Sequence, residues 1–368
     1  VVVILPGWAR GVADLDRPPP GCLRRLAVPW RQSRVAIQRQ TRRKTDLGYR
    51  AFGRYRLVIY DVRVRIALTG GTGVIGLRTI PALIQASHEV VVLVRSEAKA
   101  RVVHDLGAKA VIGDLFSGDD LRTLFDGADV AINLATHIPV GLAAAIPGAW
   151  RANDLIRTKG VAGICEAAQQ SGVQRLIQES VSYLYADAGT DWINEDSALD
   201  ITAVTEPMAM AESQVASYVS PTHSAVALRF GLIVGDDPMS RFNLKAVRSR
   251  RPIGLGDPQG WAHVIHTDDV GTAVAAAVTA PSGVYNVGAA PVRRSDLVEG
   301  YAVVAGVKPT GFVGPVVRRI GGARLEPLSR SLRVCNERFT AATGWAPRRP
   351  RFSPDWLALT SEAKTVPQ

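Results

Sequence analysis

A glycine-rich segment from Leu68 to Gly76 constrains the fold of this 368-residue chain more than any other feature. It follows an apolar stretch at 65–69 and precedes a helical pattern at 74–85. Its glycines fit both the G-x-G-x-x-G and the G-x-x-G-x-x-G spacing. Glycines so placed turn the chain tightly, let the backbone approach a pyrophosphate, and bring it to the free N–H groups of a helix N-terminus. The pattern predicts a dinucleotide-binding βαβ turn. The expected contacts are Gly70, Gly71, Thr72, Gly73, Val74, Ile75 and Gly76.

Apolar, β-branched segments alternate with helical patterns in the rest of the chain. We expect further strands at 89–94, 110–112, 129–134, 174–178, 224–230 and 283–286, and a long helix over 150–171. Such alternation is typical of an α/β fold, here a Rossmann-type doubly wound parallel sheet with a smaller C-terminal substrate lobe. The predicted domains are 64–235 with 262–290 for nucleotide binding, 236–261 and 291–357 for the substrate lobe, and 358–368 as a tail.

The net charge of +11 is concentrated in the first segment of the chain. Residues 1–64 hold 14 basic and 4 acidic residues, whereas the remainder holds 30 basic and 29 acidic residues. Because the rest is nearly neutral, the charge gives no reason to expect a nucleic-acid partner. Residues 1–63 include a triple proline and show no periodic pattern. We expect a basic extension that is either disordered or mis-annotated, since a GTG start codon translated literally gives valine; a functional basic arm is the alternative.

Three further expectations follow from composition. Cys22, Cys165 and Cys335 lie far apart and show no metal-ligand spacing, which predicts no metal site and fits free thiols in a reducing cytoplasm. Cys165, in an apolar helical run, is expected to be a buried structural thiol. No apolar run approaches the roughly 20 residues of a membrane span, so we expect no membrane partner. The expected partner is a small-molecule substrate, and the expected state is a monomer or a homodimer.

The end of the second predicted strand indicates which dinucleotide is preferred. A site that prefers NAD usually has an acidic residue about 20 residues beyond the glycines, to hold the ribose 2′-hydroxyl. Here Arg95 closes the strand and Lys99 follows. A guanidinium can grip a 2′-phosphate, so we expect NADP(H) to be preferred, with NAD(H) possible. Asp114 and Leu115, after the third strand, are expected at the adenine end.

From 64 to 357 the chain resembles the extended short-chain dehydrogenases/reductases, also called the NAD-dependent epimerase/dehydratase family. The resemblance includes the glycine turn, the Asn-Leu-Ala motif at 133–135, the Leu-Arg-Phe-Gly strand at 228–231, and the His-x-x-His-x-Asp-Asp segment at 263–269. It implies that Leu134 and Ala135 lie beside the nicotinamide. We interpret Asp269 as the cap of the next helix and His266 as a packing residue, not as metal ligands.

Members of this family use a Ser or Thr after the fifth strand and a later Tyr-x-x-x-Lys. This chain contains no Tyr-x-x-x-Lys, and the resemblance places Val181, Val204 and Met208 at the three positions. Hydride transfer by the cofactor stays possible, and a different proton donor could serve. Our candidates are Tyr183, if its pKa is tuned toward neutrality, with Ser180 or Ser182 orienting the substrate, and His137 near the nicotinamide. Glu179 and Glu212 are weaker candidates.

The sequence leaves three functions open. The first is an NADP(H)-dependent oxidoreductase that acts on a small-molecule carbonyl, alcohol or activated alkene. The second is a non-catalytic NADP(H)-sensing protein. The third is a sugar-nucleotide epimerase or dehydratase with unusual acid and base residues. Consumption of cofactor by the purified protein distinguishes the first function from the second.

Overall fold

The computed structural model describes residues 63–141, 143, 146, 148–314 and 325–358. The basic segment expected at 1–63 lies outside this part of the chain, apart from Arg63, and so does most of the expected tail.

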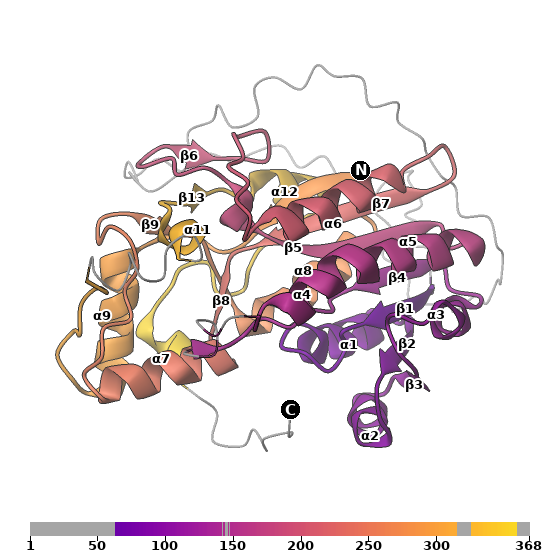
Figure 1. The fold of residues 1–368 in the computed structure, drawn as a ribbon, viewed down its shortest axis with the longest axis horizontal. Coiled ribbons are helices and arrows are strands. Elements are labelled where there is room, and N and C mark those ends of the chain that lie inside the picture. The colour runs from indigo at the N-terminus through magenta and orange to yellow at the C-terminus, as the bar shows by residue number, and fades with distance from the viewer. Residues whose placement is uncertain (1–62, 142, 144–145, 147, 315–324, 359–368) are drawn as a thin grey trace, which may run out of the picture.

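A seven-stranded parallel sheet forms the centre of the molecule (Figure 1). The strands lie in the order β11-β7-β5-β4-β1-β2-β3, and the order reverses between β1 and β4. This is the doubly wound topology that the sequence predicts, and dinucleotides bind where such an order reverses. The bounds are β1 Arg65–Thr69, β2 Glu89–Val94, β3 Lys109–Ile112, β4 Val130–Asn133, β5 Arg175–Val181, β7 Ser224–Phe230 and β11 Gly283–Val287.

Helices cover both faces of the sheet because its strands are apolar on both sides. One face packs against α1 (Gly76–Gln85), α2 (Glu97–Asp105) and α8 (Thr267–Ala277). The other packs against α3 (Gly118–Phe125), α5 (Val161–Gln170) and α6 (Glu206–Ser217). Two separate hydrophobic cores result, one on each side.

The long helix expected over 150–171 is interrupted. It consists of α4 (Arg151–Leu155), a single π-helical turn η2 (Ile156–Gly160), and α5. The Thr158 hydroxyl bonds back to the Asp154 carbonyl oxygen at 2.6 Å, and the buried Arg157 reaches from this turn to the end of β5. Single π turns inside α-helices occur frequently at functional sites. Apolar periodicity alone could not reveal this one.

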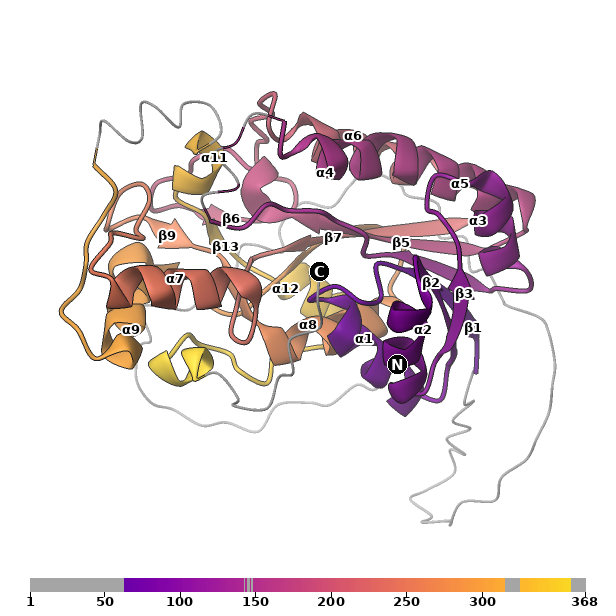
Figure 2. The same cartoon turned by 60° about the horizontal axis from the view of Figure 1, so that its bottom comes forward.

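A third hydrophobic core lies between α7 (Pro238–Arg248), α9 (Arg294–Ala305) and η5 (Pro354–Leu357). Both views place α7 and α9 at one end of the molecule, away from α2 and β3 (Figures 1 and 2). The remaining short elements are η3 Ser182–Leu184, β6 Trp192–Ile193, β8 Leu232–Val234, β9 Trp261–Ala262, β10 Val264–His266, β12 Val292–Arg293, α11 Glu326–Ser329, β13 Arg333–Val334 and α12 Glu337–Thr343.

Candidate functional site

The glycine turn joins β1 to α1 at the point where the strand order reverses. Its glycines differ in the space that is available for a side chain. A Cβ on Gly70, whose φ is +75°, would lie 2.4 Å from the backbone nitrogen of Ala135, and a Cβ on Gly76 would lie 2.3 Å from the Gly70 carbonyl oxygen. These two glycines therefore permit close packing within the protein. Gly73 is exposed, and its Cβ would meet only the Gly70 carbonyl oxygen, at 3.3 Å.

The N-terminus of α1 is open to an anion. Its N-cap residue, Ile75, offers no side-chain hydrogen bond, and the first turn contains no acidic residue. The Leu77 and Arg78 N–H groups already donate to the Gly73 and Ile75 carbonyl oxygens, so it is the N–H groups of Val74–Gly76, with the positive end of the helix dipole, that can bind phosphate oxygens. The turn and the helix end fit the pyrophosphate of a dinucleotide, and Gly73 is the residue whose missing side chain leaves the approach clear.

The residues expected at the adenine end lie at the carboxyl ends of β2 and β3. Arg95 is exposed and Lys99 half-exposed, and within the described part of the chain neither side chain forms an ion pair or a hydrogen bond. Ser96 caps α2 by accepting from the Lys99 backbone N–H at 3.4 Å. The Asp114 carboxylate is exposed and accepts from the Phe116 N–H at 3.0 Å, while Leu115 packs against Gly160. The Arg95 and Lys99 side chains are thus available to bind a ligand beside this loop.

A buried chain of amide and hydroxyl groups crosses the carboxyl ends of β1, β4 and β5. The Thr69 hydroxyl donates to Asn133 Oδ1 at 2.6 Å, and Asn133 Nδ2 donates to Gln178 Oε1 at 2.8 Å. Asn133 Oδ1 also accepts the Ala135 backbone N–H at 3.1 Å. The network therefore holds the turn after β4, with Leu134 and Ala135, against the glycine turn.

A fully buried ion pair lies one residue further along β5. The Arg157 guanidinium donates to both Glu179 carboxylate oxygens, at 3.1 and 2.7 Å, and to the Glu179 carbonyl oxygen at 3.3 Å. Burial raises the pKa of Glu179, and the Arg157 charge opposes that rise. Glu179 was predicted only as a weak acid candidate, and its partner Arg157 was not predicted. The sequence signal for this ion pair was the polar pair Gln178-Glu179, which directly follows apolar strand residues.

The resemblance places three apolar residues at the positions of the family's catalytic groups. Val181 and Val204 are half-buried, and Met208 is buried in the first turn of α6. Ser180 was a candidate for orienting substrate, but it is fully buried and donates to Glu212 Oε1 at 2.5 Å. Glu212 in turn forms a two-point ion pair with Arg229. Ser180, Glu212 and Arg229 are therefore joined by hydrogen bonds into one network.

The other catalytic candidates differ in their surroundings. Tyr183 is half-buried, and burial raises the pKa of its phenol while Arg294 opposes the rise. The condition set for Tyr183 as a proton donor, a pKa tuned toward neutrality, is not met here, because desolvation outweighs the Arg294 charge. Ser182 is buried, and its hydroxyl has no partner among the described residues. His137 is exposed, and its backbone N–H donates to Asn153 Oδ1 at 3.2 Å.

The His-x-x-His-x-Asp-Asp segment departs from the sequence expectation. His266, not Asp269, caps α8: its Nδ1 accepts the Asp268 N–H at 3.1 Å. The Asp269 carboxylate instead accepts the backbone N–H groups of Arg348 and Arg349, at 2.9 and 3.1 Å, and so anchors the C-terminal segment. That partner lies 79 residues away, which a local capping pattern cannot indicate. Within the described residues, no group of three or more His, Cys, Asp or Glu side chains gathers as a metal site would require.

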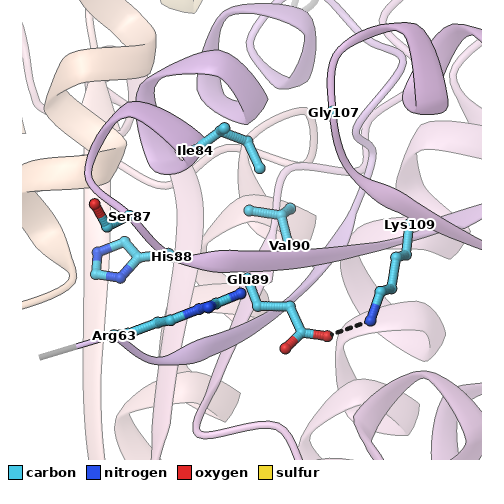
Figure 3. A pocket seen from close by; sticks show the side chains of 8 residues that line it. All are labelled: Arg63, Ile84, Ser87, His88, Glu89, Val90, Gly107 and Lys109. Atoms are coloured by element: carbon cyan, nitrogen blue, oxygen red, sulfur yellow. Dashed lines mark hydrogen bonds and ion pairs between the residues drawn. The ribbon is translucent and has the colours of Figure 1, made fainter. Parts of the chain in front are cut away.

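A cavity of about 510 Å³ lies at the opposite, amino end of β2 and β3 (Figure 3). Glu89 and Lys109, the first residues of the two strands, form an ion pair at 2.8 Å across it. Ligands of doubly wound sheets bind beyond the carboxyl ends of the strands, so this cavity is not the candidate site. The lining residues are Arg63, Ile84, Ser87, His88, Glu89, Val90, Gly107 and Lys109.

Comparison with known proteins agrees with this geometry. The family model described as "NAD dependent epimerase/dehydratase family" matches residues 66–288. The chain belongs to the NAD-dependent epimerase/dehydratase family. This confirms the resemblance drawn from the glycine turn and the later motifs, and it places the chain among NAD(P)-dependent oxidoreductases and epimerases.

The sequence identity between this chain and individual relatives is low. A 3-diazoavenalumate denitrifying reductase from a Streptomyces species is 26% identical over 306 residues, which cover 78% of this chain and 98% of the relative. Ceramide reductase from Caulobacter vibrioides is 25% identical over 256 residues, 68% of this chain and 73% of the relative. The solved structure of MoeE5 with UDP-glucose and NAD has a TM-score of 0.64 at 21% identity and covers 80% of this chain and 96% of that protein. At this identity the structural likeness shows the fold alone.

No helix among the described residues combines the length and the apolar character needed to cross a membrane.

Proposed function

We propose that this protein is an NADP(H)-dependent reductase of a small-molecule carbonyl compound or activated alkene. The observation that carries the proposal is the exposed Gly73 in front of the uncapped N-terminus of α1, at the point where the strand order reverses. The relatives named as reductases support the direction of the reaction. One of them, matched over 98% of its length, is named for a diazo substrate, so acceptors other than sugar nucleotides occur among the relatives.

The chain's own residues bind and orient the reactants. When bound, the nicotinamide supplies a hydride, so that a carbonyl compound, NADPH and one proton give an alcohol and NADP⁺. Gly70–Gly76 would hold the pyrophosphate, Arg95 and Lys99 would hold the 2′-phosphate, and Asp114 and Leu115 would hold the adenine. Leu134 and Ala135 would lie beside the nicotinamide. We also propose that 236–261 and 291–357 form the substrate lobe.

Turnover is the direct test of this proposal. Purified protein should oxidise NADPH in the presence of benzaldehyde or cyclohexenone, with product confirmed by mass spectrometry. The second candidate function, an NADP(H)-sensing protein, is favoured by the apolar Val181, Val204 and Met208. A protein whose Tm rises with NADPH but which oxidises none with any carbonyl or enone tested would favour that function instead.

Cofactor preference is tested by replacing Arg95. If Arg95 and Lys99 bind the 2′-phosphate, the wild-type protein should bind NADPH about tenfold or more tightly than NADH, since a charge-assisted hydrogen bond contributes about 1.5–3 kcal/mol. Arg95→Ala should remove most of that difference and leave the NADH affinity unchanged. Titration calorimetry measures both affinities. Equal binding of NADPH and NADH by the wild-type protein would show that Arg95 and Lys99 do not bind the 2′-phosphate.

A further inference from the structure

Exposed large apolar side chains are concentrated at the edge of the central sheet where the strands end. Eight large apolar side chains are exposed among the described residues, and six of these lie at or after the carboxyl ends of β3, β4 and β5, before the next α-helix. Single exposed apolar residues are ordinary, whereas apolar side chains that gather in one region mark a surface that a ligand or partner covers. The six are Ile112, Phe116, Ile138, Ile146, Leu199 and Ile201.

The segment that follows β4 carries one of these residues close to the proposed position of the nicotinamide. Ile138 is 44% exposed and lies three residues after Ala135, whose backbone N–H donates to Asn133 Oδ1 at 3.1 Å. The segment then reaches α7 of the proposed substrate lobe, because a Cβ on Gly141 would lie 2.4 Å from the Phe242 ring. An exposed apolar side chain thus lies between the proposed cofactor site and the substrate lobe.

The segment that precedes α6 places two further apolar side chains beside the end of β5. Leu199 forms an antiparallel bridge with Tyr185, and the Asp200 N–H donates to the Leu184 carbonyl oxygen at 3.0 Å. These contacts hold the segment against η3, the turn that directly follows β5. Leu199 is 44% exposed and Ile201 is 41% exposed. Because β4 and β5 are neighbouring strands, the segments that follow them leave the sheet at the same edge.

These two segments contain no positive charge that could bind a diphosphate. Neither 134–150 nor 182–204 contains a lysine or an arginine. The Arg330 guanidinium does reach the second segment, but it is fully buried and donates to the Tyr185 carbonyl oxygen and to the backbone and side chain of Asp200. Charged oxygens need such donors, whereas an apolar group gains from leaving water beside apolar side chains. Both segments therefore suit an uncharged apolar group better than the diphosphate of a sugar nucleotide.

We propose that the substrate carries an uncharged alkyl or aryl group that binds against Ile138, Leu199 and Ile201. The inference rests on the proposed function and names the class of its substrate: an apolar aldehyde, ketone or enone, and not a sugar nucleotide. The reducible group lies at the nicotinamide, and the apolar group extends over the segments that follow β4 and β5. Binding removes both apolar surfaces from water, and this gain selects the substrate.

Straight-chain aldehydes of increasing length test the substrate class. Burial of one methylene group raises affinity by a factor of about three to four, so kcat/KM with NADPH should rise at least about tenfold from propanal to octanal. In the double variant Ile138→Ser, Ile201→Ser this rise should shrink to about threefold or less, with NADPH affinity unchanged. Val303→Ser is the matched control, because Val303 is 60% exposed but belongs to α9, and it should keep the wild-type rise. A wild-type kcat/KM that does not increase with chain length, or a full rise in the double variant, would overturn the proposed class.

Binding of unreactive amides separates this inference from the proposed reaction. Octanamide and propanamide are analogues of the two aldehydes, and calorimetry follows their binding to NADPH-loaded protein. We expect the wild type and Val303→Ser to bind octanamide at least about tenfold more tightly than propanamide, and the double variant to bind the two nearly alike. If the wild type reduces no aldehyde but binds the amides in this pattern, the proposed reaction fails and the apolar site stands. Equal wild-type affinities for the two amides, or tighter binding of UDP-glucose than of octanamide, would contradict the apolar site.

Discussion

Replacing Gly73 by valine should abolish measurable NADPH binding while the protein remains folded. The added side chain would stand in front of the N-terminus of α1, where the pyrophosphate must approach the backbone. At least two charge-assisted hydrogen bonds of about 1.5–3 kcal/mol each would be lost, so the affinity should fall by about 10²-fold or more. The protein itself should tolerate the change, because Gly73 is exposed and only the Gly70 carbonyl oxygen lies near its Cβ direction.

Gly76→Ala is the informative comparison. A Cβ there would lie 2.3 Å from the Gly70 carbonyl oxygen and 2.5 Å from the Gly71 backbone, so the turn itself must move. We expect this variant to lose both cofactor binding and several degrees of Tm. Calorimetric titration with NADPH and thermal unfolding without ligand separate the two outcomes. Wild-type affinity in Gly73→Val would mean that the turn serves the fold and not a dinucleotide.

These two glycines also show what the sequence could predict. The spacing between a strand and a helix identified the turn, and β1, β2 and β7 have the predicted bounds, because a buried parallel strand is a continuous apolar run. The spacing could not tell which glycine packs inside the protein and which is exposed. That distinction depends on the Cβ direction at Gly73 and Gly76, which only coordinates provide.

The residues that sequence reasoning missed are polar groups whose partners lie far along the chain. β5 was expected to end at Gln178 because apolar residues stop there, yet the strand continues to Val181. Glu179 remains in the sheet because Arg157, 22 residues earlier, neutralises it from a π turn. His263 likewise occupies space left by Gly231 and Gly288. A pattern of apolar residues contains no information about such pairings.

The ion pair of Arg157 and Glu179 leads to the second large prediction. Arg157→Met should lower the free energy of unfolding by about 3–5 kcal/mol, because it leaves a buried carboxylate without its partner. This corresponds to a fall in Tm of roughly 6–15 °C for a domain of this size. The double variant Arg157→Met, Glu179→Leu removes both charges and keeps similar volumes, so it should recover most of the lost stability. Chemical denaturation of the three proteins measures these differences.

Arg157→Met should lower the free energy of unfolding by an amount that depends on pH. That dependence tests whether the unpaired charge of Glu179 causes the loss. Without the guanidinium, burial and the Glu212 charge both raise the pKa of Glu179, so in the folded protein this pKa should lie further above the unfolded value of about 4.3. A carboxyl group with a raised folded pKa contributes its full stability below the unfolded pKa and loses it as pH rises through the folded pKa. The loss in free energy of unfolding caused by Arg157→Met should therefore be largest at neutral pH and shrink toward pH 5. The double variant should show no such trend. A single variant as stable as the wild type at neutral pH, or a deficit that does not change with pH, would show that Glu179 is not held as a buried charge by Arg157.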